Sequence, residues 1–93
     1  MQLYTINATS YRREYSDEIN KARFDNMPYV VSDTLGSMGI DGFTIYEVMG
    51  FWEGEREPSY KIEVLTELDF DVMAGLCEQI RHVYNQDAVI LQC

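Results

Sequence analysis

The fold is decided by one stretch of ten residues, Phe43-Thr44-Ile45-Tyr46-Glu47-Val48-Met49-Gly50-Phe51-Trp52. Successive residues of a strand point to opposite faces of a sheet, and here both alternating sets are largely apolar. The stretch therefore predicts a β-strand that is covered on both faces. Helices can cover one face. In a chain of 93 residues, the cover for the other face is expected to come from another subunit.

The chain after this strand predicts a hairpin, a helix and one more strand. The acidic segment 53–58 is expected to connect the hairpin, and residues 59–66 to form its second strand, because apolar and charged side chains alternate there. Asp69 can cap a helix over 70–84. The apolar stripe of that helix consists of Met73, Leu76, Cys77, Ile80, Val83 and Tyr84. The short apolar segment 88–92 is the predicted last strand.

The chain before the central strand predicts a strand, a long connection and a helix. Residues 2–9 alternate with the two-residue period of a half-buried strand. Residues 11–25 are polar and are expected to form a long connection with room for a helical turn. Asn26 and Pro28 then indicate a helix start, because asparagine caps exposed amides and proline fits the first turn. The core-facing side of this helix consists of Met27, Val31, Leu35 and Met38.

The predicted order of elements is therefore β-α-β-β-α-β, in a single domain over residues 1–93. Two split β-α-β halves in one short chain are typical of the ferredoxin-like α+β sandwich, in which a four-stranded antiparallel sheet carries both helices on one face. The other face stays open. Apolar residues are expected on that open face, and they predict that the protein works as an oligomer.

The charge balance of the chain is strongly acidic. Seven Lys and Arg residues stand against 16 Asp and Glu residues, which gives a net charge of −9. Nucleic acid and anionic membranes are disfavoured as partners, because both bind basic surfaces. A cationic small molecule or a basic protein would be attracted. Alternatively, the charge serves only to keep a small protein soluble.

Composition and targeting signals point to a soluble cytoplasmic protein. The chain is 46% hydrophobic, as in ordinary globular domains, and its apolar stretches are too short to span a bilayer. Its first residues lack the pattern of a signal peptide. Cys77 and Cys93 are expected to be free thiols, and together with His82 they do not form a transition-metal set. We expect no metal and no cofactor.

Glu47 is the most informative single residue of the central strand. It interrupts an alternating set whose other members are large and apolar, namely Phe43, Ile45, Met49 and Phe51. A carboxylate in that place is partly desolvated, so it needs a partner or has a raised pKa. Two interpretations stay open. Glu47 forms an ion pair with Lys61 on the adjacent strand, or it points into a ligand cleft and binds a cation there.

Aromatic side chains are concentrated around the same hairpin. Tyr46, Phe51, Trp52 and Tyr60 could hold an ammonium or sulfonium group or stack on a purine, although such rings are also ordinary core or interface residues. No nucleophile stands out, because no serine has an adjacent histidine and there is no phosphate-binding glycine loop. An enzyme built on this chain would work by positioning and electrostatics.

Three segments carry a resemblance to a known family, namely 29–35, Gly42 with 47–52, and 83–91. The best parts are the acid Glu47 three positions before Gly50, and the stretch Gln86-Asp87-Ala88-Val89 with its hydrophobic end. Together these segments resemble the bacteriophage S-adenosylmethionine (SAM) lyases, a family once described as SAM hydrolases. Scattered identities extend over roughly residues 29 to 91, and the segment 53–58 has no counterpart.

The resemblance implies a PII-like trimer that binds its ligand in clefts between subunits. It also implies a reaction in which SAM splits into 5′-methylthioadenosine and L-homoserine lactone, because the substrate's own carboxylate attacks its γ-carbon and displaces the sulfonium. Carried over to this chain, Glu47 would engage the α-amino group and Gln86 would contact the nucleoside. Tyr46, Phe51 and Tyr60 would pack on the adenine or the sulfonium.

Two other functions remain open at the level of sequence. One is a non-enzymatic PII-like trimer that binds a nucleotide or a partner protein and regulates it. The other is a phage protein that sequesters a host protein through its acidic surface. A lyase needs a desolvated carboxylate in a pocket, whereas the sequestering protein would present its acids on one exposed face.

Overall fold

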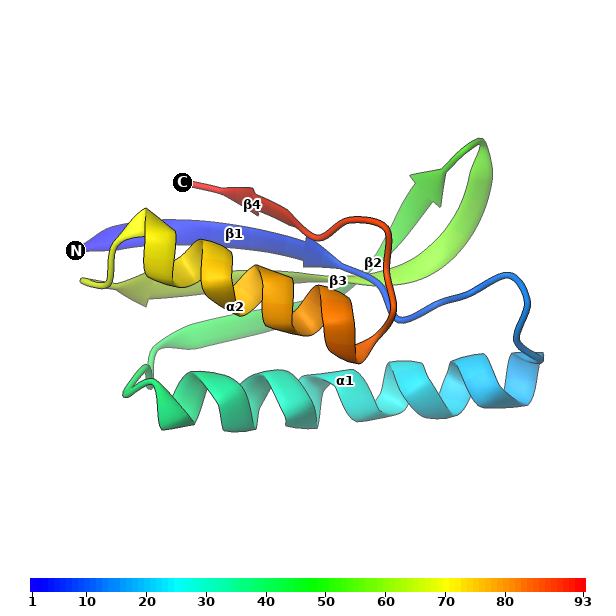
Figure 1. Cartoon of the computed structure of the whole chain (residues 1–93), viewed down its shortest axis with the longest axis horizontal. Coiled ribbons are helices and arrows are strands. Elements are labelled where there is room, and N and C mark those ends of the chain that lie inside the picture. The colour runs from blue at the N-terminus through cyan, green and yellow to red at the C-terminus, as the bar shows by residue number, and fades with distance from the viewer.

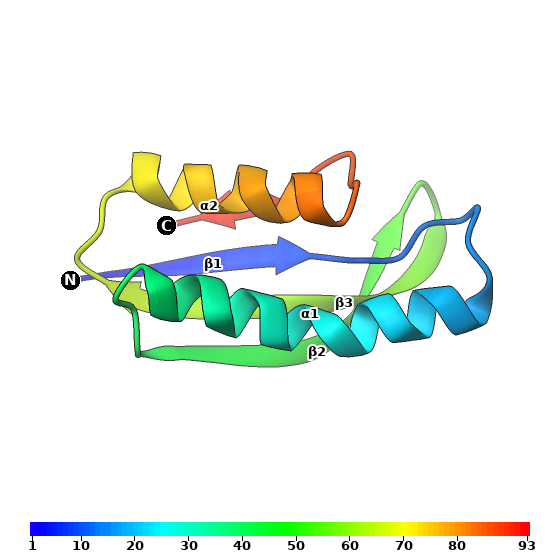
Figure 2. The ribbon, with the colours of Figure 1, turned by 60° about the horizontal axis from the view of Figure 1, so that its bottom comes forward.

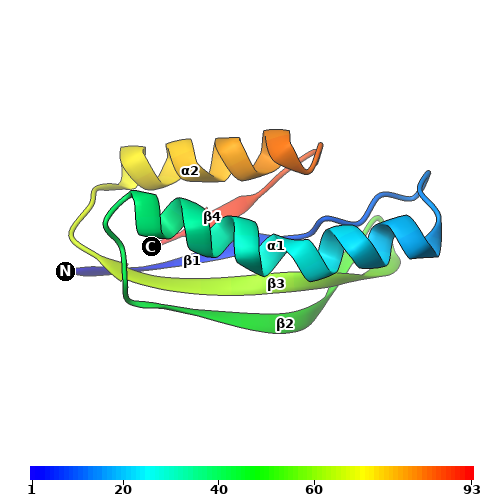
Figure 3. The ribbon, with the colours of Figure 1, turned by 90° about the horizontal axis from the view of Figure 1, so that it is seen from below.

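The computed structural model describes all residues, Met1 to Cys93, and confirms the α+β class and the predicted order of elements. Its elements are β1 (Gln2–Ala8), α1 (Asp17–Ser37), β2 (Phe43–Trp52), β3 (Glu55–Thr66), α2 (Phe70–Val83) and β4 (Ile90–Gln92). The strands form one antiparallel sheet in the order β2-β3-β1-β4 (Figure 1). Both helices lie on the same face of the sheet (Figures 2 and 3), as in a ferredoxin-like sandwich.

The core lies between the sheet and the two helices. The alternation predicted for β1 and β3 is confirmed, and Asp69 caps α2 by accepting a hydrogen bond from the Val72 amide at 3.0 Å. The largest fully buried apolar side chains are Tyr4, Ile6, Met27, Val31, Leu35, Ile62, Val64 and Met73. Two members of the predicted helix stripes differ. Val83 is 54% exposed and Met38 only borders the core, because each lies at the last turn of its helix, beyond the sheet.

The predicted start of the first helix is wrong by about two and a half turns. The helix α1 begins at Asp17, where the Ser16 hydroxyl accepts a hydrogen bond from the Ile19 amide at 3.2 Å. Acidic residues at 17 and 18 suit the positive end of the helix dipole. The first two turns of the helix lack an apolar stripe because Asn20 and Arg23 bind the polar loop before the helix. Segment 11–25 is therefore largely helical, and Pro28 lies inside the helix.

Tyr60 explains why a proline is tolerated inside α1. Pro28 has no N–H, so the carbonyl of Phe24 loses its partner in the helix. The Tyr60 hydroxyl donates a hydrogen bond to that carbonyl at 2.9 Å, and the Tyr60 and Phe24 rings stack with centroids 4.2 Å apart. The side chain is 3% exposed, and burial raises the pKa of its phenol to about 12. Tyr60, predicted from the resemblance to pack on a ligand, thus lies in the core.

We expect Tyr60→Phe to lower the free energy of unfolding by about 1–2 kcal/mol, because the Phe24 carbonyl is left without a partner. In a Pro28→Ala background the same change should cost less than about 0.5 kcal/mol, since the new amide at position 28 can donate to that carbonyl. Urea unfolding of the four proteins measures both values. The exposed Tyr29 serves as the control for loss of a phenol. Equal costs in the two backgrounds would contradict the explanation.

The hairpin between β2 and β3 is tighter and longer than predicted. The two strands pair without a break from Phe43 with Val64 to Trp52 with Glu55. Only Glu53 and Gly54 form the turn, and both have positive φ, 51° and 78°, which is the pattern of a two-residue hairpin turn. The connection predicted over 53–58 is therefore wrong, because its last four residues belong to β3. The last strand is also shorter than predicted, Ile90–Gln92.

The outer part of this hairpin, residues 48–59, is called the arm below. It bends away from the flat part of the sheet, beyond the reach of α2 (Figure 1). Its side chains are mostly exposed, although residues 48–52 are largely apolar and residues 55–57 are charged. The arm carries one edge of the cleft described below.

The open face of the sheet is only partly apolar. Half-buried Thr5, Asn7, Lys61 and Glu63 occupy its middle, on the paired strands β1 and β3. Tyr46 lies beside them, with its ring 5.8 Å from the Lys61 ammonium, and the neighbouring Glu63 carboxylate raises the pKa of its phenol. Exposed apolar residues surround this polar centre, namely Leu3, Val48, Trp52, Leu65 and Ile90. The expected continuous apolar face is thus interrupted.

Candidate functional site

A cleft of about 500 Å³ lies at one end of the sheet. The arm forms one side, and the loop 9–14 with the segment 86–90 forms the other. The base is closed where the Thr9 hydroxyl donates a hydrogen bond to the Pro58 carbonyl at 2.7 Å. The arm lines the cleft with residues of both strands: Val48, Met49, Gly50, Phe51 and Trp52 from β2, and Glu55, Glu57 and Ser59 from β3.

Gly50 keeps the floor of the cleft clear. It lies opposite Glu57 in the pairing of the two strands. A Cβ atom at position 50 would come within 2.7 Å of the Ser59 hydroxyl oxygen, closer than two such atoms can approach without movement. The absence of a side chain therefore leaves space between Trp52 and Ser59, and that space belongs to the cleft.

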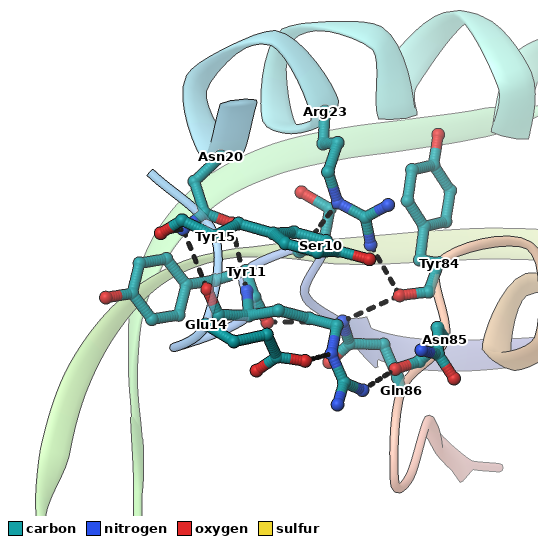
Figure 4. A network of polar contacts seen from close by, with 10 residues as sticks. Ser10, Tyr11, Glu14, Tyr15, Asn20, Arg23, Tyr84, Asn85 and Gln86 are labelled. Atoms are coloured by element: carbon teal, nitrogen blue, oxygen red, sulfur yellow. Dashed lines mark hydrogen bonds and ion pairs between the residues drawn. The ribbon is translucent and has the colours of Figure 1, made fainter. Parts of the chain in front are cut away.

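The loop wall of the cleft is held by the first half of α1, the part of the helix that the sequence did not reveal. Asn20, only 6% exposed, is the main anchor. Its side-chain oxygen accepts a hydrogen bond from the Arg12 amide at 2.9 Å. Its side-chain nitrogen donates to the carbonyls of Arg12, at 2.9 Å, and Tyr15, at 3.3 Å (Figure 4). Asn20 thus fixes the backbone of the loop.

Arg23, one turn further along α1, ties the same loop to the end of α2. Its guanidinium donates to the carbonyls of Ser10, at 3.1 Å, and Tyr84, at 2.5 Å (Figure 4). It also lies 4.9 Å from the Tyr15 ring centre and 5.6 Å from that of Tyr84, within range of cation–π attraction. Three segments distant in sequence are therefore joined by one side chain.

Gln86 lines the cleft, as its predicted role in ligand contact requires, but its amide nitrogen is already used. That nitrogen donates to the carbonyls of Tyr11, at 3.2 Å, and Tyr84, at 3.0 Å. The side chain thus joins the loop 9–14 to the segment that follows α2. The geometry gives Gln86 a role in shaping the wall of the cleft.

The charged residues of the cleft differ between its two sides. The arm contributes only acids, Glu53, Glu55 and Glu57, whereas the other side contributes both signs, Arg12, Arg13, Glu14 and Asp87. Arg12 is engaged by the Glu14 carboxylate, which raises the pKa of the guanidinium and lowers that of the acid. Arg13 makes one contact across the mouth of the cleft, 3.8 Å to Glu53.

Glu57 is the carboxylate of the cleft whose pKa is raised. Partial burial raises its pKa, an effect that the positive charge of Arg13 partly offsets. The sequence interpretation treated Glu57 as part of a solvated hairpin tip and so missed it. The tight turn at Glu53-Gly54 could have revealed Glu57, because this turn places Glu57 on the same strand face as Trp52.

Of the residues predicted for the site, some line the cleft and others lie outside it. Phe51 and Gln86 line the cleft, although Phe51 is 70% exposed. Glu47 and Tyr46 lie outside it, as does the buried Tyr60. Glu47 is exposed on the helix side of β2, where it pairs with Tyr60 across the strands.

The predicted ion pair between Glu47 and Lys61 is wrong. Lys61 pairs with Tyr46, so its side chain lies on the opposite face of the sheet from Glu47. A strand register that differs by one residue from the expected one is enough to separate the two charges. Lys21 of α1 is instead a basic residue on which the Glu47 charge acts.

Neither a candidate metal site, nor a membrane-spanning helix, nor a matching protein family is found for this chain. The chain brings no three His, Cys, Asp or Glu side chains together in a way that could hold a metal ion. Neither helix combines the length and apolar character needed to cross a membrane. Comparison of the chain with protein-family models and with curated proteins gives no match.

Proposed function

We propose that the protein is an SAM lyase whose substrate binds in the cleft beside the arm. One observation carries the proposal: the half-buried carboxylate of Glu57 faces the same cleft as the aromatic ring of Trp52. A carboxylate in a place of reduced polarity attracts a cation strongly. An aromatic face attracts a sulfonium or stacks on a purine. SAM offers both groups.

The proposed reaction needs no nucleophile from the protein. The substrate carboxylate forms a bond to its own γ-carbon while the bond from that carbon to sulfur breaks. The sulfur keeps the electron pair and leaves as neutral 5′-methylthioadenosine, and the amino acid closes to L-homoserine lactone. Opposite charges disappear in this step, so a site that excludes water favours it. Ser59 is the serine that lines the cleft, and no histidine lines it.

Glu57 is best suited to bind the α-ammonium group of the substrate. The sulfonium loses its charge during the reaction, so a carboxylate paired with it would stabilise the substrate more than the transition state. The ammonium keeps its charge throughout. A carboxylate on that group can therefore hold the substrate without opposing the reaction. We therefore propose for Glu57 the role that the resemblance gives Glu47.

The proposal also includes a cytoplasmic homotrimer. Exposed apolar side chains on the open face and on the arm support association, among them Leu65, Met49 and Phe51. Glu47 does not line the cleft of its own chain. We propose that, in the oligomer, it approaches a ligand in the cleft of a neighbouring subunit.

The test is incubation of the purified protein with SAM, followed by chromatography for 5′-methylthioadenosine and homoserine lactone. We expect both products in equal amounts. Binding of SAM without product would instead favour a non-enzymatic, PII-like ligand-binding protein. Absence of both binding and product, in a protein with intact folding and a defined oligomeric state, would overturn the proposal.

A further inference from the structure

The charged residues that line the cleft indicate more about the ligand than that it is a cation. The arm presents only acidic side chains to the cleft, whereas the other side presents Arg12 and Arg13 together with Glu14 and Asp87. Both of these acids act on Arg12, so Arg13 is the positive charge that a ligand meets opposite the acidic arm. Arg13 and Glu57 are close enough for the arginine to affect the pKa of the acid. A ligand that carries a carboxylate and an ammonium on one carbon matches such a pair.

The two arginines of the loop are not equivalent. The Arg12 guanidinium donates to the Glu14 carboxylate and to the Asn85 carbonyl, so its hydrogen bonds are already made within the chain. The Arg12 backbone is held on both sides by Asn20. Arg13 follows directly in the chain, so its backbone is fixed at the edge of the cleft.

The Arg13 side chain, in contrast, is available to a ligand. Its ion pair with Glu53 spans 3.8 Å, and the two side chains are 59% and 67% exposed. Exposed pairs of this kind contribute little stability, so a ligand can replace the contact at small cost. A guanidinium binds a carboxylate with two parallel hydrogen bonds, which fixes orientation as well as charge.

We infer that Arg13 is a specificity-determining residue that binds the carboxylate of the ligand, and that the cleft therefore selects zwitterionic amino-acid ligands over simple cations. The inference rests on the proposed function, because it names how the same cleft distinguishes SAM from related molecules. The α-ammonium lies on Glu57 and the carboxylate on Arg13, which places the nucleophile of the reaction at the loop side of the cleft.

Trp52 provides the measurement. It is the one tryptophan of the chain and lines the cleft, so its fluorescence reports ligand binding directly. Stopped-flow mixing records that signal before the substrate is consumed. Three ligands are compared: SAM, decarboxylated SAM and 5′-methylthioadenosine. Decarboxylated SAM carries more positive charge than SAM, so the net charge of −9 alone would make it bind better.

We expect the wild-type protein to bind SAM at least tenfold more tightly than decarboxylated SAM, and Arg13→Gln to abolish that preference. Arg56→Gln is the matched control, because Arg56 has the same charge, lies on the arm and does not line the cleft. It should keep the preference.

Two results would overturn the inference but leave the proposed function intact. In the first, Arg13→Gln retains the preference for SAM. In the second, the wild-type protein converts SAM but binds SAM and decarboxylated SAM equally well. Failure to bind any of the three ligands would overturn the proposed function together with the inference.

Discussion

Replacement of Glu57 by glutamine is expected to weaken SAM binding by about 10–100-fold while leaving the protein at least as stable as the wild type. The loss follows from the charge-assisted hydrogen bond between the carboxylate and the substrate ammonium, which contributes about 1.5–3 kcal/mol. Glutamine has the same shape and keeps an acceptor oxygen, so the arm should not change. Trp52 fluorescence and the initial rate of methylthioadenosine formation measure the effect.

The stability of Glu57→Gln tests whether the Glu57 carboxylate is partly buried in the folded protein. Burial raises the pKa of Glu57 in the folded protein, so the folded state favours the neutral acid. Its contribution to stability is present below the unfolded pKa and is lost as pH rises through the folded pKa. At pH 7 the charged Glu57 is thus a cost that glutamine removes. We expect a gain of up to about 0.5 kcal/mol at pH 7, since the side chain is half exposed, and a smaller difference at pH 4.

Two further variants make the result specific. Glu55→Gln removes the same charge two residues away, on the same face of the arm, and should weaken binding far less than Glu57→Gln. Glu47→Gln tests the role that the resemblance assigns. If Glu47→Gln abolishes turnover and Glu57→Gln does not, the ammonium is bound by Glu47 of a neighbouring subunit, and our assignment of Glu57 is wrong.

The sequence predicted those parts of the fold that depend on apolar periodicity. Strand β3 and helix α2 follow from alternating or stripe-like residues that meet a single core, and Ile62 and Met73 are indeed fully buried. The first half of α1 has no such stripe. Its one buried residue before Met27 is Asn20, whose partners lie in a loop, so hydrophobic patterning could not reveal this half.

The site was harder to predict than the fold because it depends on contacts between distant segments. Gln86, which the resemblance predicts to contact the nucleoside, lines the cleft. Glu57 and Arg13 were missed, since each belongs to a polar segment whose position depends on another part of the chain. A two-residue turn places the first, and Asn20 positions the loop that carries the second.

Asn20→Ala is the second change for which we expect a large effect, a loss of about 2–3 kcal/mol in the free energy of unfolding. The substitution leaves the Arg12 amide and the Tyr15 carbonyl without their Asn20 partner, and buried groups of this kind cost about 1–3 kcal/mol each when water does not fully replace the bond. The Arg12 carbonyl loses one of two hydrogen bonds and keeps that from the Tyr15 amide at 3.1 Å. For a domain of this size, the melting temperature should fall by about 10 °C or more.

Comparison with two variants separates the hydrogen bonds of Asn20 from general helix effects. Asn20→Asp keeps the acceptor for the Arg12 amide but loses both donated bonds, so it should also be destabilising. Lys21→Ala, at the next position, removes only an exposed pair with Asp25 and should change stability by less than about 0.5 kcal/mol. A value within that range for Asn20→Ala would contradict the role of Asn20 as an anchor.

Loss of the Asn20 anchor should affect the cleft more than loss of stability alone would. Under conditions where Asn20→Ala remains folded, the loop is free to move Arg13 away from the arm, so SAM should bind more weakly and the preference over decarboxylated SAM should shrink. Lys21→Ala is the control: it should stay stable and bind SAM normally, which would exclude a general effect of changes in α1. The polar half of α1 is then explained by the site it supports: it contributes little to the apolar core, and it holds the loop that carries Arg13 opposite the acidic arm.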